Sequence, residues 1–130
     1  IELSKTFERD GRPASEDPLM RQKLAQAFIE VEILKYNIYR SATEIKRSGK
    51  PGPESSIIKL FWSEMDRRQK EVAMEMLGPY SQLVKGSKRA VHHGKWPRAF
   101  LWSRAGTIYA GSSEIQRNII AERVLRLPRV

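Results

Sequence analysis

Apolar side chains recur at steps of three and four residues between Pro18 and Ser48, and this periodicity constrains the fold more than any other feature of the sequence. Such spacing is typical of one face of an α-helix, here about nine turns long. Asp17 is a suitable N-cap and Pro18 fits a first helical turn, so we expect the helix to begin there. The apolar stripe consists of Met20, Leu24, Ala27, Phe28, Val31, Leu34, Ile38, Ala42 and Ile45. Neighbouring apolar residues widen it, which predicts contact with more than one partner element: Ile29, Ile33 and Tyr36.

Glycine and proline divide the rest of the chain into further helices. The stretch 48–53 (Ser-Gly-Lys-Pro-Gly-Pro) predicts a C-cap glycine and a tight link, so the second helix should pack antiparallel to the first. We expect residues 1–17 to be an irregular lead-in with turns at Asp10-Gly11 and Asp17-Pro18, and residues 81–95 to form a loop. Helices are predicted at about 18–48, 54–78, 97–109 and 113–126. The predicted fold is all-α, an up-and-down four-helix bundle, in one domain that covers residues 1–130.

Composition excludes several classes of protein. The chain has 130 residues and no cysteine, which rules out a disulfide scaffold and a thiolate metal site. No apolar run reaches the roughly 20 residues of a membrane span, and the first residues show no signal-peptide pattern. We therefore expect a cytoplasmic protein without a membrane span. The only histidine pair, His92-His93, has no further ligands at suitable spacing, so we expect no metal site.

Positive charge is concentrated in the last third of the chain. Residues 85–130 hold ten Lys or Arg and two acidic residues, against 14 and 13 in residues 1–84. Such a segment suits an anionic partner, either a phosphate-bearing cofactor, an acidic protein surface or nucleic acid, and it also fits a plain solvated face. A basic helical nucleic-acid-binding module is the weakest of these interpretations because the charge falls mainly in a loop with few aromatic residues. We expect no nucleic-acid partner.

One block near the C-terminus is more specific than the helical pattern. Residues 107–129 read Thr-Ile-Tyr-Ala-Gly-Ser-Ser-Glu-Ile-Gln-Arg-Asn-Ile-Ile-Ala-Glu-Arg-Val-Leu-Arg-Leu-Pro-Arg. This block closely resembles the C-terminal signature of the flavin-dependent acyl-CoA dehydrogenases, and the order of predicted helices resembles that family's C-terminal helical domain. The final Leu125-Arg126-Leu127-Pro128-Arg129 carries arginine where the family usually has glycine.

The resemblance implies an oxidoreductase of lipid metabolism with FAD as cofactor and an acyl-CoA thioester as substrate. In the family a carboxylate removes the α-proton while a hydride leaves the β-carbon for the flavin. An N-terminal helical domain and a β-domain precede the bundle, so we expect those domains to lie outside residues 1–130 and this piece alone to be inactive. The resemblance also implies sister subunits in a homo- or hetero-oligomer, a dimer or tetramer, and an electron-transfer acceptor.

The same resemblance assigns roles to the turn before the last helix. Gly111, Ser112 and Glu114 fall at cofactor-binding positions, and Tyr109 and Gly111 at substrate-binding positions. Helix N-termini suit cofactor phosphates and hydroxyls, and glycine permits close approach. From the residues alone, Ser113 with Gln116 has the form of a capping box, which would explain the local chemistry without any ligand.

Two departures from the family pattern concern the reaction. Ala110 occupies the position of the catalytic Glu of many relatives, so we expect no catalytic residue in residues 1–130; the base would come from an upstream helix or from a non-identical subunit. The family's Q-x-x-G-G element aligns with Glu75-Met76-Leu77-Gly78-Pro79, where a carboxylate and a proline disfavour pyrophosphate and favour a helix stop. These departures favour the alternative function, a catalytically silent assembly subunit of a heteromeric dehydrogenase.

Overall fold

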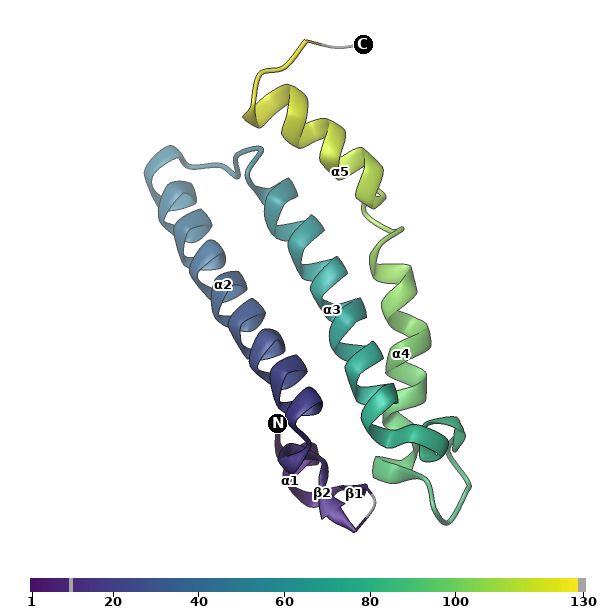
Figure 1. The fold of residues 1–130 in the computed structure, drawn as a ribbon. Coiled ribbons are helices and arrows are strands. Elements are labelled where there is room, and N and C mark those ends of the chain that lie inside the picture. Colours follow the sequence, from purple (N-terminus) through teal and green to yellow (C-terminus); the bar gives the residue numbers. More distant parts are fainter. Residues whose placement is uncertain (10, 129–130) are drawn as a thin grey trace.

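The computed structural model describes residues 1–9 and 11–128, and three long helices dominate it. They lie side by side with α3 in the middle, and α5 continues beyond α4 and tilts across the end of α3 (Figure 1). The helices are α1 (Glu2–Thr6), α2 (Pro18–Ser48), α3 (Ser55–Leu77), α4 (Lys95–Gly106) and α5 (Ser113–Ile119). The predicted all-α class is confirmed.

The ends of α2 follow from the capping chemistry that the sequence predicts. The Asp17 carboxylate accepts a hydrogen bond from the Met20 N–H at 2.9 Å, and Pro18 occupies the first turn. At the other end Gly49 adopts a left-handed conformation with φ of 77°, and its N–H donates to the Ile45 carbonyl at 2.8 Å. Both predicted caps are confirmed.

The lead-in is more ordered than the sequence suggested. Instead of an irregular segment it contains α1, a two-residue antiparallel pair of β1 (Glu8–Arg9) with β2 (Arg12–Pro13), and a 3-10 turn, η1 (Ala14–Glu16). Elements this short carry no periodicity that a sequence could reveal, and tertiary packing of Leu3 and Ala14 holds them in place. The predicted turn residue Asp10 and the terminal Arg129 lie outside the described residues.

Other helix ends differ from prediction by a few residues. Helix α3 is one residue shorter at each end than 54–78, and α4 covers 95–106 rather than 97–109 because Gly94 initiates it and the chain turns after Gly106. The predicted last helix is α-helical only to Ile119 and finishes in a π-helical turn over Ile120–Val124. The loop predicted at 81–95 overlaps the end of one 3-10 turn, η2 (Gly78–Gln82), and contains a second, η3 (Val91–Gly94).

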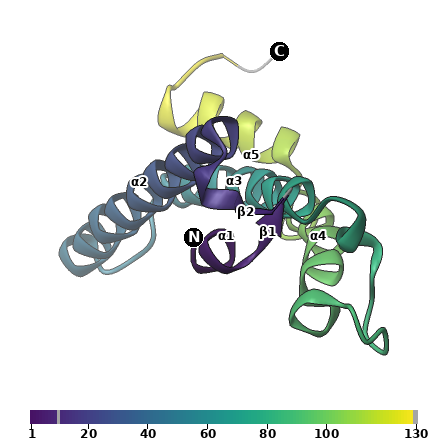
Figure 2. The same ribbon diagram turned by 60° about the horizontal axis from the view of Figure 1, so that its bottom comes forward.

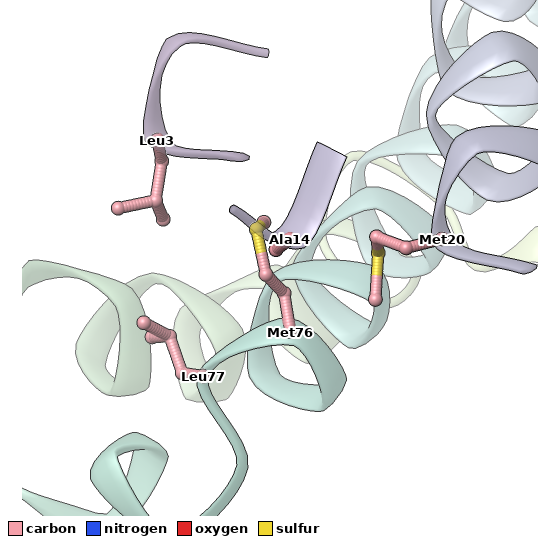
Figure 3. Packing of buried hydrophobic residues seen from close by; sticks show 5 residues of the cluster. All are labelled: Leu3, Ala14, Met20, Met76 and Leu77. Carbon is pink, nitrogen blue, oxygen red and sulfur yellow. The ribbon is translucent and has the colours of Figure 1, made fainter. Parts of the chain in front are cut away.

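The buried hydrophobic cluster lies at one end of the helical layer. There α1, η1, the start of α2 and the end of α3 converge (Figures 2 and 3), and Trp96 of α4 packs against the cluster. Its members are Leu3, Ala14, Met20, Met76 and Leu77. Leu77 is only 1% exposed and is the most deeply buried of them.

Away from this cluster, much of the apolar stripe of α2 faces solvent. The exposed fraction is 55% for Phe28, 63% for Tyr36 and 46% for Ile38. Polar contacts join α2 to α3 instead: Glu30 accepts from the Arg68 guanidinium at 3.0 Å, and Gln69 donates to the Ala27 carbonyl at 3.3 Å. The apolar face of α2 is therefore wider than the part that α3 covers.

Candidate functional site

A tight reversal joins α4 to α5 and contains the residues that the sequence singled out. The Tyr109 N–H donates to the Ala105 carbonyl at 3.0 Å, and the Ser113 N–H donates to the Thr107 carbonyl at 3.0 Å. Between them Ala110 and Gly111 both have positive φ, 54° and 89°. We call residues 107–112 the Gly-Ser turn. A left-handed alanine is uncommon, so tertiary contacts must hold this turn in shape.

The cap of α5 is Ser112, one residue earlier than predicted. The Ser112 hydroxyl accepts from the Ile115 N–H at 3.4 Å, so the expected capping box of Ser113 with Gln116 is wrong. Both of those side chains are buried and bind elsewhere: Gln116 donates to the Ala110 carbonyl at 2.9 Å, and Ser113 donates to Glu64 at 2.8 Å. They fasten the turn to the protein interior.

Two features of the turn favour glycine at position 111. Its φ of 89° belongs to the left-handed region that favours glycine. A Cβ at this position would also lie 2.6 Å from Nε2 of Gln116, which is closer than van der Waals contact allows. The glycine therefore fits the hydrogen bond of Gln116 as well as the backbone conformation.

Two side chains of α3 support the turn, and nothing in the sequence indicated them. Lys59 Nζ donates to the Gly111 carbonyl at 2.6 Å. Glu64 accepts from Ser113 and also pairs with Arg67 at 3.2 Å and Arg117 at 3.7 Å. Lys59 lies 52 residues before Gly111 and Glu64 lies 49 residues before Ser113, so no local spacing could have linked them to the turn.

The predicted site residues lie along the Gly-Ser turn and the start of α5, where Gly111 and Ser112 are half-buried. Tyr109 is 44% exposed, with its ring centroid 6.4 Å from that of Trp62, and Ala110 is exposed. Glu114 is exposed, and its own backbone N–H, then the Ser112 hydroxyl, lower the pKa of its carboxyl below the usual 4.5; Arg117 and Lys59 add smaller attractions. The methyl group of Ala110 offers no proton acceptor in this turn.

The stretch Glu75–Pro79, which aligns with the family's Q-x-x-G-G element, lies far from this turn. Glu75 is 16 residues beyond Lys59 on α3, about 24 Å along the helix axis. Its carboxylate pairs with Lys23 of α2, so its charge is partly neutralised, and the helix ends at Gly78 with Pro79 opening η2. The structure therefore does not bring Glu75–Pro79 and the Gly-Ser turn together.

The basic segment surrounds an open cavity on the outer face of α4. This cavity has a volume of about 1030 Å³, and its walls include Leu101 and Trp102, which are 70% and 71% exposed. His92 and His93 line it with left-handed backbones, φ 46° and 55°. Its cations form no ion pair within residues 1–9 and 11–128: Lys85, Lys95 and Arg98. Lys88 and Arg89 lie in the loop before it and are exposed.

Two other kinds of site are absent from the described part of the chain. No three side chains among His, Cys, Asp and Glu cluster there as metal ligands would. None of the described helices combines the length and apolar character that crossing a membrane requires.

Comparison with known sequences decides the family. The family described as acyl-CoA dehydrogenase, C-terminal domain, matches residues 1–125. The chain belongs to this family. The resemblance found in the sequence is thereby confirmed.

Two relatives of this acyl-CoA dehydrogenase domain come from Mycolicibacterium smegmatis and Mycobacterium tuberculosis. Acyl-CoA dehydrogenase IpdE1 of Mycolicibacterium smegmatis is 38% identical over 130 residues, which is 99% of this chain and 29% of that protein. IpdE1 of Mycobacterium tuberculosis is 39% identical, covering 98% of this chain and 32% of that protein. The domain thus spans about a third or less of these relatives.

A solved structure shares the fold of the domain. The crystal structure of the ChsE4-ChsE5 complex from Mycobacterium tuberculosis superposes with a TM-score of 0.84 at 26% identity. The match covers 99% of this chain and 33% of the other.

Proposed function

We propose that this domain is the C-terminal part of an FAD-dependent dehydrogenase that introduces an α,β double bond into an acyl-CoA thioester, and that it contributes to cofactor binding and subunit assembly. The observation that carries the proposal is the Gly-Ser turn. The turn and the start of α5 place the exposed Tyr109 and Glu114 beside the half-buried Gly111 and Ser112, within a block that matches the family.

The turn fits the polar groups of a flavin nucleotide. Neither the Gly111 nor the Ser112 N–H donates to an acceptor within residues 1–9 and 11–128, and both can serve a ligand oxygen. The Ser112 hydroxyl accepts a long 3.4 Å cap hydrogen bond from the Ile115 N–H and can also donate, either to the neighbouring Glu114 carboxyl or to a ligand oxygen. Bound FAD would supply the hydride acceptor; the turn would hold its hydroxyl or phosphate oxygens, while Tyr109 and Gly111 would border the substrate.

The proton-abstracting carboxylate would come from outside this domain. Ala110 cannot accept a proton, and Glu64 is committed to Ser113, Arg67 and Arg117. Glu114 adjoins the cap of α5, where we assign it to the cofactor rather than to the substrate. This chain alone would be inactive.

A second candidate function is that of a silent subunit that completes a heteromeric dehydrogenase. Ala110 favours it, and so does the similarity to ChsE4-ChsE5, which is a complex of two differently named proteins. The uncovered apolar residues of α2 would suit a sister subunit in either case. We propose an electron-transfer acceptor for the assembled enzyme.

The proposal is tested by titrating the ¹⁵N-labelled chain with FAD and following the backbone amide resonances. We expect FAD to shift Gly111 and Ser112, Ser112→Ala to weaken that response, and Ser87→Ala, an exposed serine in the loop before α4, to leave it unchanged. Shifts confined to the cavity on α4, or no shifts at all, would reject the assignment. Purification of the whole dehydrogenase that contains this domain separates the two functions. Co-purification with a different dehydrogenase chain supports the heteromer, and an active homomer rejects it.

A further inference from the structure

Two consecutive carbonyl groups of the Gly-Ser turn are held by side chains from outside it. Gln116 Nε2 donates to the Ala110 carbonyl at 2.9 Å, and Lys59 Nζ donates to the Gly111 carbonyl at 2.6 Å. Gln116 is buried at 6% exposure, and Lys59 is half-buried on the central helix α3. Both donors therefore project from well-packed helices.

Peptide planarity converts these contacts into a constraint on the amides. In a trans peptide the N–H points opposite to the C=O of the same unit. Fixing the Ala110 carbonyl therefore fixes the Gly111 N–H, and fixing the Gly111 carbonyl fixes the Ser112 N–H. Both N–H groups are directed away from their carbonyl's donor, and neither has an acceptor in the part of the chain that the structure describes.

The choice of partner for Lys59 is unusual in this chain. Three other lysines on α2 and α3 pair with carboxylates: Lys23 with Glu75, Lys35 with Glu32 and Lys70 with Asp66. Lys59 has no carboxylate within ion-pair distance among the described residues and donates to a neutral carbonyl. A cation on that carbonyl makes a charge-assisted hydrogen bond, which is stronger than a neutral one.

We propose that Lys59 and Gln116 are positioning residues that orient the Gly111 and Ser112 amides toward the cofactor. This inference rests on the proposed function and adds to it a support from α3. Without Lys59 the Gly111 carbonyl keeps only a long 3.5 Å hydrogen bond from Gln116 Nε2. The peptide unit between Gly111 and Ser112 is then held less firmly, because the glycine φ imposes no single orientation. The two amide donors would then become ordered only when the cofactor binds, and the free-energy cost of ordering them would weaken binding.

The test combines carbonyl and amide chemical shifts with FAD titration of the full chain. Lys59→Met removes the donor and keeps an unbranched apolar stem, Lys59→Arg restores a charged donor, and Lys70→Met on the same helix is the matched control. We expect Lys59→Met to shift the Gly111 ¹³C carbonyl and Ser112 ¹⁵N resonances and to weaken FAD binding about tenfold, about 1.4 kcal/mol. Lys59→Arg should restore most of the wild-type resonance positions and most of the FAD affinity. Lys70→Met should change neither the resonances nor the affinity.

Each outcome decides one part of the inference. Unchanged Gly111 and Ser112 resonances in Lys59→Met would overturn the positioning role, and so would altered resonances with unaltered FAD affinity. If the wild-type chain binds no FAD, the proposed function fails for this chain while the resonances still report whether Lys59 sets the turn. If Lys59→Met does not fold, Lys59→Gln, a neutral donor, should give an intermediate shift; a wild-type spectrum would contradict the role.

Discussion

Glu64 offers the sharpest test of how α3 holds the Gly-Ser turn. Its carboxylate is 18% exposed and accepts from the buried Ser113 hydroxyl at 2.8 Å. It also faces Arg67 at 3.2 Å and Arg117 at 3.7 Å. The perturbation is Glu64→Ala, which removes all three contacts and leaves the buried Ser113 hydroxyl without its acceptor. Arg67 and Arg117 keep only their ion pairs with Glu71 at 4.0 Å and Glu114 at 3.7 Å.

The cost follows from the burial of each contact. A hydrogen bond to a charged group contributes about 1.5 to 3 kcal/mol, and its loss here strands Ser113, which is 4% exposed. Arg67 and Arg117 are 42% and 56% exposed, so solvent screening limits each ion pair to about 0.2 to 1 kcal/mol. We expect Glu64→Ala to lower the free energy of unfolding by about 2 to 4 kcal/mol.

The assay is urea unfolding followed by circular dichroism, with Glu71→Ala as the matched control. Glu71 lies on the same helix and contacts Arg104 at 2.8 Å, but it is 47% exposed and bonds no buried hydroxyl, so its loss should cost about 0.5 to 1 kcal/mol. Glu64→Gln keeps an acceptor for Ser113, so its loss in the free energy of unfolding should lie between those of Glu64→Ala and Glu71→Ala. The reasoning is refuted if Glu64→Ala costs no more than Glu71→Ala.

Three further predictions concern the core, the turn and its charge. Leu77→Ala should destabilise the chain by about 2 to 5 kcal/mol in the same assay, whereas Leu101→Ala, at a 70% exposed position, should stay within about 0.5 kcal/mol; equal losses would contradict the core described above. Gly111→Ala should cost more than about 1 kcal/mol, the strain of a left-handed non-glycine residue, and displace the Gln116 side-chain amide resonances, so an unperturbed spectrum would argue against the turn. The pKa of Glu114, measured by NMR titration, should lie below 4.5 and rise in Ser112→Ala. Because folding lowers that pKa, its small stabilising effect should be complete above pH 4.5 and disappear as the pH falls through the folded value; a pKa at or above 4.5 would contradict the assignment.

The sequence predicted those parts of the fold that depend on local chemistry. The 18–48 helix carried a long apolar period, a capping Asp17 and a terminal Gly49, and all three are seen. The prediction that residues 1–17 are irregular was wrong, because a five-residue helix and two-residue strands are too short to show a hydrophobic period. The predicted end of the last helix was wrong because Arg126 adopts a left-handed conformation, with φ of 58°. No residue type at that position indicates this conformation.

The candidate site divides in the same way. Residues 109–114 were identified because they are contiguous and match a family block. Their supports, Lys59 and Glu64, are distant in sequence and belong to a helix whose polar face shows no distinctive spacing. The cap was misplaced by one residue because Ser112 and Ser113 have identical side chains; only burial and Glu64 distinguish their roles.

The central claim is that the Gly-Ser turn holds a flavin nucleotide, and a crystal structure of the protein grown with FAD tests it most directly. We predict cofactor oxygen atoms about 2.7 to 3.2 Å from the backbone nitrogens of Gly111 and Ser112. FAD density confined to the cavity on α4, with residues 109–114 in contact with no part of it, would contradict the claim.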